Sequence, residues 1–218
     1  MNKNYKEKIN KIVSEEGFYS FFKKLMKYIG YKTISIQRLI IYELDLNNFI
    51  EKQDTQIEII FKVASENDLD SLDKEHYHYS DYGRQWLKHQ QTKGDRCILA
   101  IKKGKIIGYV WIMKGKMELS INNCIKIPQN KVYIYNGFVL NEYRGKRVLN
   151  AIDYYIIDIL INEGKKFILT TVATNNKPSI HARKRIGFKK IGNITQFRFF
   201  GLNYDYISKK DFKYLQKP

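Results

Sequence analysis

The chain has little of what would make it fibrous, disulfide-stapled or membrane-spanning. Its 218 residues include only three prolines and two cysteines, and no apolar run approaches the roughly 18 residues that a spanning helix needs. Cys97 and Cys124 have neither metal-ligand spacing nor the count of a disulfide framework. The lysine-rich residues after Met1 contain no apolar signal-peptide core. We therefore expect a cytoplasmic protein that holds no metal.

Positive charge is what the chain has in excess. Lys and Arg number 39 against 22 Asp and Glu, a formal net charge of +17, in a chain that is 44% hydrophobic and 28% charged. That composition is typical of a folded domain. Its charge favours nucleotide phosphates, nucleic acid or an anionic membrane as partner. Because the basic residues are spread over the whole length and no nucleic-acid reading motif is visible, we do not expect a nucleic-acid partner.

The first fifty residues read as an extension joined to a larger domain. Ser14 is a candidate helix N-cap, and Gly30 stands where a left-handed terminator would. Residues 15–29 are predicted as a basic amphipathic helix that packs on its own domain, on a partner or on a membrane. Residues 33–46 predict one or two strands, and the polar stretch after them indicates a boundary, giving an extension over 1–50 and a domain over 51–218. The helical stripe consists of Phe18, Phe21, Phe22, Leu25, Met26 and Ile29.

From residue 57 onward, strand and helix patterns alternate. Lys103-Gly104 is a tight-hairpin signal between two apolar strands, Pro178 suits a first helical turn, and Gly187 suits a helix end. The order predicts an α+β fold, a sheet with helices on its faces. The expected strands cover 57–63, 96–102, 105–113, 131–140, 166–173 and 189–200, and the expected helices lie near 65–72, 86–91, 147–163 and 178–186.

A basic turn comes after the strand predicted over 131–140. It holds Arg144, Gly145, Lys146 and Arg147, and the next helix begins directly after it. Free backbone N–H groups at a helix N-terminus, together with these cations, form a concave site suited to a pyrophosphate.

This turn resembles the acetyl-CoA signature of the GNAT superfamily of N-acetyltransferases, Val-x-Pro-x-x-Arg/Gln-x-x-Gly-x-Gly/Ala. Val139 and Arg144 match the pattern. Asn141 replaces the proline, and Arg147 and Leu149 replace the two signature glycines. Glycines let a backbone approach the pyrophosphate closely, so these two replacements bear on how tightly a cofactor is held.

Two further segments resemble the same family. Residues 176–179, with Gly187-Phe188 at matching distance, are similar to the later motif Asn-x-x-Ala/Ser-x-x-x-Tyr-x-x-x-Gly-Phe. Residues 104–110 are similar to the family's second hairpin strand. The resemblance covers about residues 57–200 and implies a mixed, mostly antiparallel central sheet with helices on both faces.

The resemblance implies that acetyl is transferred from acetyl-CoA to a primary amine in a direct ternary complex. A backbone N–H near residues 138–140 would stabilise the oxyanion, and the Asn176 side chain would contact the pantetheine arm. The cofactor-binding residues it implies are Phe138, Val139, Leu140, Arg144, Gly145, Lys146, Arg147, Val148, Leu149, Asn176, Ser179 and Arg183.

The sequence says less about the catalytic acid, the catalytic base and the residues that bind the acceptor amine. Arg183 stands where the family carries an acidic tyrosine; arginine stays protonated, so we expect it to stabilise the thiolate or to contact a CoA phosphate. The base candidates are Glu118, His76 and His78, with Asn136 at a position where many relatives carry a carboxylate. Aromatic walls with polar tips suit a sugar or nucleobase ring, and by resemblance a nucleotide-linked amino sugar is the preferred acceptor. The expected acceptor-binding residues are Tyr79, Tyr82, Trp86, Tyr133 and Tyr135.

Two functions other than an N-acetyltransferase also remain open. The replaced glycines and the missing tyrosine also fit a non-catalytic module that binds acyl-CoA or docks on a membrane through residues 15–29. The charge fits a nucleic-acid binder, which the salt dependence of any affinity would reveal. A homodimer is left open as well.

Overall fold

The computed structural model describes residues 34–50, 55, 57–72, 80–120, 123–199 and 202–207. The helix predicted over 15–29 lies outside the described residues, and so do His76, His78 and Tyr79. For Tyr82 and Glu118 the backbone is described and the side chain is not.

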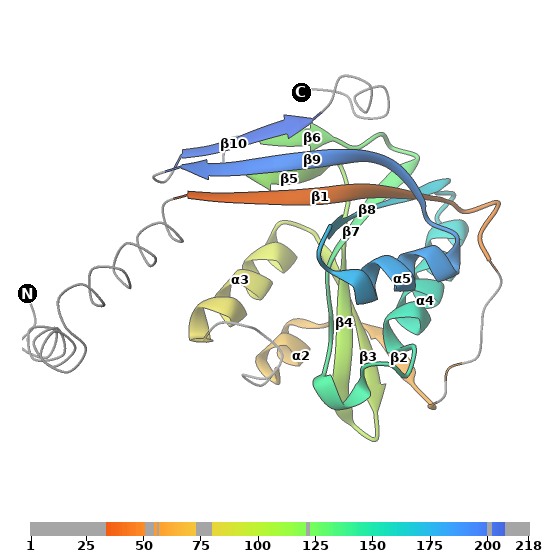
Figure 1. The fold of residues 1–218 in the computed structure, drawn as a ribbon. Coiled ribbons are helices and arrows are strands. Elements are labelled where there is room, and N and C mark those ends of the chain that lie inside the picture. Colours follow the sequence, from red (N-terminus) through yellow and green to blue (C-terminus); the bar gives the residue numbers. More distant parts are fainter. Residues whose placement is uncertain are drawn as a thin grey trace, which may run out of the picture.

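Eight strands form one sheet in the order β10-β9-β1-β8-β7-β4-β3-β2 (Figure 1). Neighbouring strands run antiparallel, except for the parallel pair of β7 and β8. The sheet is therefore mixed and mostly antiparallel, as predicted. The strands are β1 (Ile34–Asp45), β2 (Ile60–Val63), β3 (Arg96–Lys102), β4 (Lys105–Met113), β7 (Lys131–Val139), β8 (Phe167–Ala173), β9 (Lys189–Phe199) and β10 (Leu202–Ile207), and a separate hairpin pairs β5 (Lys116–Ser120) with β6 (Asn123–Lys126).

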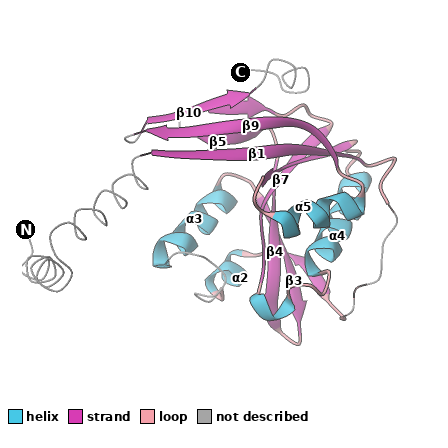
Figure 2. Cartoon of the chain, in the orientation of Figure 1, coloured by secondary structure: helices cyan, strands magenta, loops and turns pink. Residues whose placement is uncertain are grey.

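Helices cover both faces of this sheet (Figure 2). On one face, α2 (Glu66–Asp70) and α3 (Ser80–Thr92) bury Leu69 and Leu87 against β3 and β4. On the other face, α4 (Val148–Asn162) and α5 (Lys177–Ile186) bury Ile152 and Ile186 in a second cluster. Burial of these side chains on each face supplies the main driving force for assembling the layers.

Strand β1, which the sequence places in the N-terminal extension, lies inside the sheet. It pairs with β8 on one side and with β9 on the other, so that Leu39 is opposite both Ala173 and Ile194. Tyr42 and Leu44 are buried in the core. The boundary expected after residue 50 thus does not coincide with a break in the sheet.

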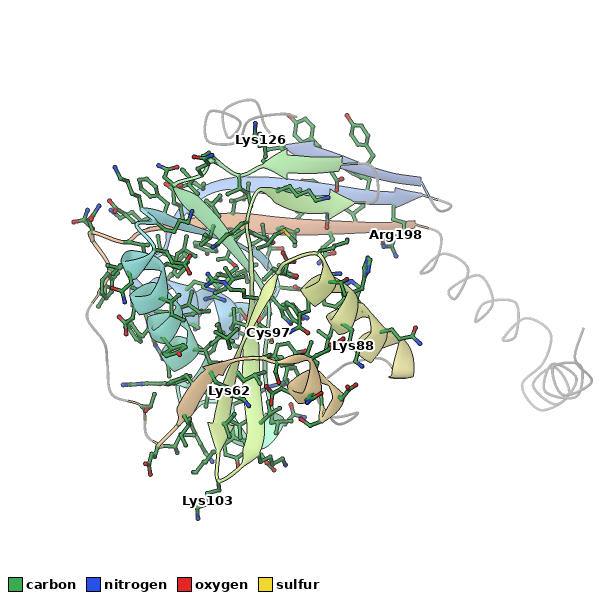
Figure 3. The ribbon with its side chains drawn as sticks, turned by 180° about the vertical axis from the view of Figure 1, so that it is seen from behind. Lys62, Lys88, Cys97, Lys103, Lys126 and Arg198 are labelled. Atoms are coloured by element: carbon green, nitrogen blue, oxygen red, sulfur yellow. The ribbon has the colours of Figure 1, made fainter. Side chains whose placement is uncertain are left out.

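The β3–β4 hairpin has the predicted bounds and turn. Lys103 and Gly104 both have positive φ, 47° and 78°, as a two-residue type I′ turn requires. Lys103 lies at the tip of the hairpin and Cys97 in the interior (Figure 3). Burial raises the pKa of the Cys97 thiol far above its usual range, so this thiol stays protonated. None of the described helices is both long and apolar enough to cross a membrane.

Candidate functional site

Strands β7 and β8 separate halfway along their length. They are in parallel register from Lys131 opposite Phe167 to Ile134 opposite Thr170. Beyond that point β7 continues beside β4, and β8 continues beside β1. Figure 1 shows the two halves of the sheet turning away from one another, with α4 and α5 lying in the angle between them. The separation leaves one edge of the second half of β7 facing a gap.

A β-bulge directs the backbone of β7 into this gap. The register with β4 shifts between Tyr109 and Trp111, and Asn136 in the bulge has a φ of 47°. The Leu140 N–H donates to the Ile107 carbonyl of β4 at 2.9 Å. Because successive residues of a strand point their amides to opposite sides, the Val139 N–H points toward the gap. Of the three residues expected to supply the oxyanion donor, Val139 has this geometry, and Leu140 does not.

The basic turn at the start of α4 has the backbone geometry of the predicted anion site. Gly145 and Arg147 have positive φ values of 78° and 62°, which bends the chain so that successive amides converge. Arg147 is the N-cap of α4 without a side-chain capping bond. The Ala151 N–H is the first in the helix to reach an i−4 carbonyl, that of Arg147. The three preceding amides, of residues 148–150, therefore stay available to an anion at the positive end of the helix dipole.

A cleft of about 820 Å³ connects this anion site with the gap. The end of β7, the basic turn, the first turn of α4 and one side of α5 line it, and none of the described lining residues is acidic. The side chain of Arg144 is held in place by a 3.0 Å bond from Nε to the Val139 carbonyl. The cofactor-binding residues predicted from the sequence that line the cleft are Phe138, Val139, Arg144, Gly145, Arg147, Val148, Leu149, Asn176 and Ser179.

Three of the predicted cofactor residues do not line the cleft. Leu140 is buried in the core on the side of α2 and α3. The Lys146 ammonium lies 5.3 Å from the centroid of the Tyr143 ring. Arg183 is 4% exposed and forms an ion pair with Asp153, which is 1% exposed. Burial raises the pKa of Asp153, and the guanidinium opposes that rise.

Sequence reasoning missed a basic stripe on α5. Lys177, His181 and Arg185 all line the cleft. They are spaced four residues apart, so they share one face of the helix, and this spacing was the available signal. The helix starts at Lys177, one residue before the predicted start at Pro178. The Asn176 side chain accepts from the Ser179 N–H at 3.2 Å, and Gly187 ends the helix, as predicted, with a φ of 102°.

Gly137 of β7 makes room for Leu149, the residue that replaces the second signature glycine. A Cβ added at Gly137 would lie 3.1 Å from Cδ1 of Leu149 and 3.8 Å from Nη2 of Arg183. The glycine in β7 therefore provides the space that Leu149 of α4 fills. Leu149 also lines the cleft, so it narrows the space beside the anion site.

Three of the predicted acceptor-binding aromatics, Trp86, Tyr133 and Tyr135, lie together on the other side of β7, and the side chains of Tyr79 and Tyr82 are outside the described part of the chain. The rings of Tyr133 and Tyr135 stack at 5.9 Å, and Trp86 meets Tyr135 edge-on at 6.2 Å. Their hydroxyls bond within the protein: Tyr135 donates to Asp95 at 2.6 Å, and Tyr133 bonds Thr171 at 2.6 Å. Burial raises the pKa of Tyr133. Asn136, beside them, is exposed.

Comparison with known proteins identifies the family to which this chain belongs. The family model of the acetyltransferase (GNAT) family matches residues 58–188, more than half of the chain. The chain belongs to the GNAT acetyltransferase family, as the sequence motifs predict. A search of curated proteins found no match. Within the described residues, no three His, Cys, Asp or Glu side chains are placed to hold a metal ion.

Solved structures share the fold at low sequence identity. A GNAT-family acetyltransferase from Colwellia psychrerythraea aligns with a TM-score of 0.56 and 11% identity, over 80% of this chain and 61% of that one. A GCN5-related N-acetyltransferase from Sphaerobacter thermophilus aligns with a TM-score of 0.52 and 10% identity, over 85% and 56%. A glucosamine N-acetyltransferase region of a fungal multi-domain β-N-acetylglucosaminidase gives 0.56 and 14%, over 81% and 23%. The chain thus spans less than two thirds of each of these proteins.

Proposed function

We propose that this chain is an N-acetyltransferase that moves acetyl from acetyl-CoA to a primary amine of a small molecule within a ternary complex. The observation that carries the proposal is the cleft itself. An uncapped, cation-rich helix N-terminus forms one end of it, and an unpaired strand edge with an inward N–H forms the other. The cation-rich helix N-terminus suits the pyrophosphate of acetyl-CoA, and the unpaired strand edge suits its thioester.

Direct transfer is favoured by what the cleft offers. The amine nitrogen attacks the thioester carbonyl, and the Val139 N–H stabilises the oxyanion that forms. No cysteine is among the described residues that line the cleft, and the Cys97 thiol is buried and protonated. The described residues therefore do not support a covalent acyl-cysteine carrier at the cleft, and we propose direct attack by the bound amine.

The proposed acceptor is an amino sugar, with a nucleotide-linked form preferred. Trp86 is 39% exposed and stands edge-on to Tyr135 next to the exposed Asn136, an aromatic surface with polar neighbours that suits a sugar ring. The fungal structural neighbour is named for glucosamine as acceptor. Glu118, His76 and His78 remain the proposed base candidates. A cytoplasmic location with peripheral membrane contact through 15–29 also stays a prediction.

Thermal unfolding with and without acetyl-CoA tests the cofactor site. Ligand at about 100 times its dissociation constant adds about 2.7 kcal/mol, which raises Tm by several degrees. We expect Arg185→Glu, which places an acidic group in the cleft, to abolish most of this shift. Lys184→Glu is the matched control, because Lys184 is exposed on the same helix but does not line the cleft. No shift in the unmodified protein at millimolar acetyl-CoA would contradict the proposal.

A second candidate is a non-catalytic acyl-CoA-binding module of the same fold. The buried Arg183, which cannot act as a proton-donating acid at neutral pH, favours it. Incubation of the acetyl-CoA-bound protein with a panel of amino sugars, followed by measurement of released CoA, separates the two. Binding without CoA release from any acceptor would favour the module.

A further inference from the structure

Arg183 is a buried cation that lies behind Gly137, a residue that lines the cleft, and does not line the cleft itself. Its Nη1 donates to Asp153 Oδ2, and the ring of Phe188 lies 5.4 Å from the guanidinium carbon. The Nε of Arg183 and Oδ1 of Asp153 are buried without a hydrogen-bond partner among the described residues. Removing two charges from water and leaving part of their hydrogen-bonding capacity unused is a net cost to folding in most proteins. The pair is therefore better explained by something that the guanidinium does than by stability.

The Nη2 atom of Arg183 lies near the place where β7 and β8 part. Nη2 lies 3.8 Å from the position of a Cβ on Gly137, the bulge residue that lines the cleft. Tyr133 and Thr171, which bridge the two strands at the same point, close the gap on the far side. The charge of Arg183 reaches the Tyr133 hydroxyl, where it opposes the effect of burial on the pKa of that group. The only hydrogen bond that the guanidinium makes within the described part of the chain is the one from Nη1 to Asp153.

We propose that the charge of Arg183, acting from behind Gly137, stabilises the departing CoA thiolate, and that the Asp153 carboxylate holds the guanidinium in place. This inference rests on the proposed function, because it requires a thioester in the cleft. In the step, the amine nitrogen forms the new C–N bond, the C–S bond breaks, and its electron pair stays on sulfur. The ammonium proton leaves to a base or to solvent. Arg183 stays protonated throughout, so electrostatic stabilisation by its buried charge replaces proton donation.

The ionisation of bound CoA itself tests this role without any acceptor. Free thiols ionise with a pKa of about 8.5. CoA is titrated on the full-length protein, and the thiolate is followed by its ultraviolet absorbance. Desulfo-CoA is the matched probe, since it reports every other titrating group near the cleft, including His181 on α5 and Asp153 on α4. We expect the pKa of bound CoA to be lower by at least about one unit, that is, thiolate favoured about tenfold over thiol.

Three variants separate an electrostatic from a structural role. Arg183→Met combined with Asp153→Asn removes both charges, so no buried carboxylate is left unpaired; the thiol pKa should return to the free value. Asp153→Asn alone leaves the guanidinium without its counter-charge and should lower the thiol pKa further. Arg185→Met removes an exposed cation of the cleft and should weaken CoA binding more than it shifts the thiol pKa.

The outcomes are distinguishable. A thiol pKa in the unmodified protein equal to that of free CoA, or one that the double variant leaves lowered, would overturn the role of Arg183 while leaving the cofactor site standing. Absence of saturable binding by both CoA and desulfo-CoA would overturn the proposed function itself. Opposite shifts in the double variant and in Asp153→Asn, with desulfo-CoA unaffected, would support the inference, because loss of packing alone would not move the thiol in two directions.

Discussion

At the scale of single residues, Arg147 carries a conformational cost at the centre of the anion site. Its φ of 62° is left-handed, a conformation that costs an L-residue roughly 1–2 kcal/mol. We expect Arg147→Gly to raise the free energy of unfolding by about 1 kcal/mol, since glycine adopts this φ freely. Lys146→Gly is the control, because Lys146 has negative φ and the same change should destabilise there. Urea unfolding measures both; equal destabilisation by the two variants would refute the strain at Arg147.

Gly137 and Leu149 are a second pair of residues whose packing is coupled. The Leu149 side chain fills the space that is left because Gly137 has no side chain. Gly137→Ala places a Cβ 3.1 Å from Leu149 Cδ1 and should destabilise the protein by roughly 1–3 kcal/mol. Leu149→Ala alone should also destabilise, through the cavity it opens. In the double variant the new methyl has room, so the two losses should not add. A double-mutant cycle from denaturant unfolding measures the coupling, and strict additivity would show that the two residues pack independently.

At the scale of elements, the capping box of α2 makes the helix sensitive to acid. Asp68 accepts from the Ser65 N–H and from Lys62, and the bond from Lys62 is the main reason that the pKa of Asp68 falls to about 2. A carboxyl whose pKa is lower in the folded state stabilises the fold above its unfolded pKa, and this contribution is lost as the pH falls from about 4 to about 2.

Asp68→Ala should therefore lower the free energy of unfolding by about 1 kcal/mol near neutral pH, and the difference from the unmodified protein should shrink toward zero as the pH approaches 2. Glu66→Ala, in the same helical turn, is the control for the helix dipole alone and should cost less. Unfolding curves across this pH range provide the measurement. A constant difference at every pH would mean that the Asp68 charge contributes nothing.

Local elements can be predicted from the sequence because their signals are local. The β3–β4 hairpin is fixed by two apolar strands around Lys103-Gly104, and α5 by the capping Asn176 and the terminating Gly187. The position of β1 between β8 and β9 is not predictable in this way, because both partners lie more than a hundred residues away along the chain. The ion pair of Arg183 is not predictable from a local pattern either, because its partner Asp153 lies 30 residues away on another helix.

The candidate site likewise has one part that a local motif predicts and another that depends on long-range strand pairing. Arg144 and Arg147 are found from a contiguous motif, and the structure brings both to the cleft. The gap between β7 and β8 forms because β7 continues to pair with β4 while β8 pairs with β1. Such long-range pairing cannot be predicted from a local sequence pattern. The bulge at Asn136 is likewise a feature of the pairing with β4.

At the scale of the whole molecule, the sheet consists of two halves joined by a short seam. β7 and β8 share only the register from Lys131 to Ile134, whereas β1 is paired along most of its length with both β8 and β9. Helices α4 and α5, linked by the bond from Asn150 Nδ2 to the Ala182 carbonyl at 2.9 Å, span the angle between the halves. The cleft lies where these elements meet, so its geometry depends on the integrity of both halves.

Deletion from the N-terminus tests how far the β1 half depends on its central strand. Removing residues 1–33 leaves every described strand pairing in place, and we expect cooperative unfolding and an unchanged Tm shift with acetyl-CoA. Removing residues 1–46 also deletes β1, which strips β8 and β9 of the partner between them and exposes Ile168 and Ile194, both buried in the intact sheet. That protein should lack a cooperative transition, because the four-residue seam to β7 cannot hold β8 in place without its neighbour. Differential scanning calorimetry of the two deletions compares them directly. A cooperative transition and acetyl-CoA binding in the longer deletion would mean that β1 is dispensable to the cleft and that the extension comprises, as the sequence suggests, the whole of residues 1–50.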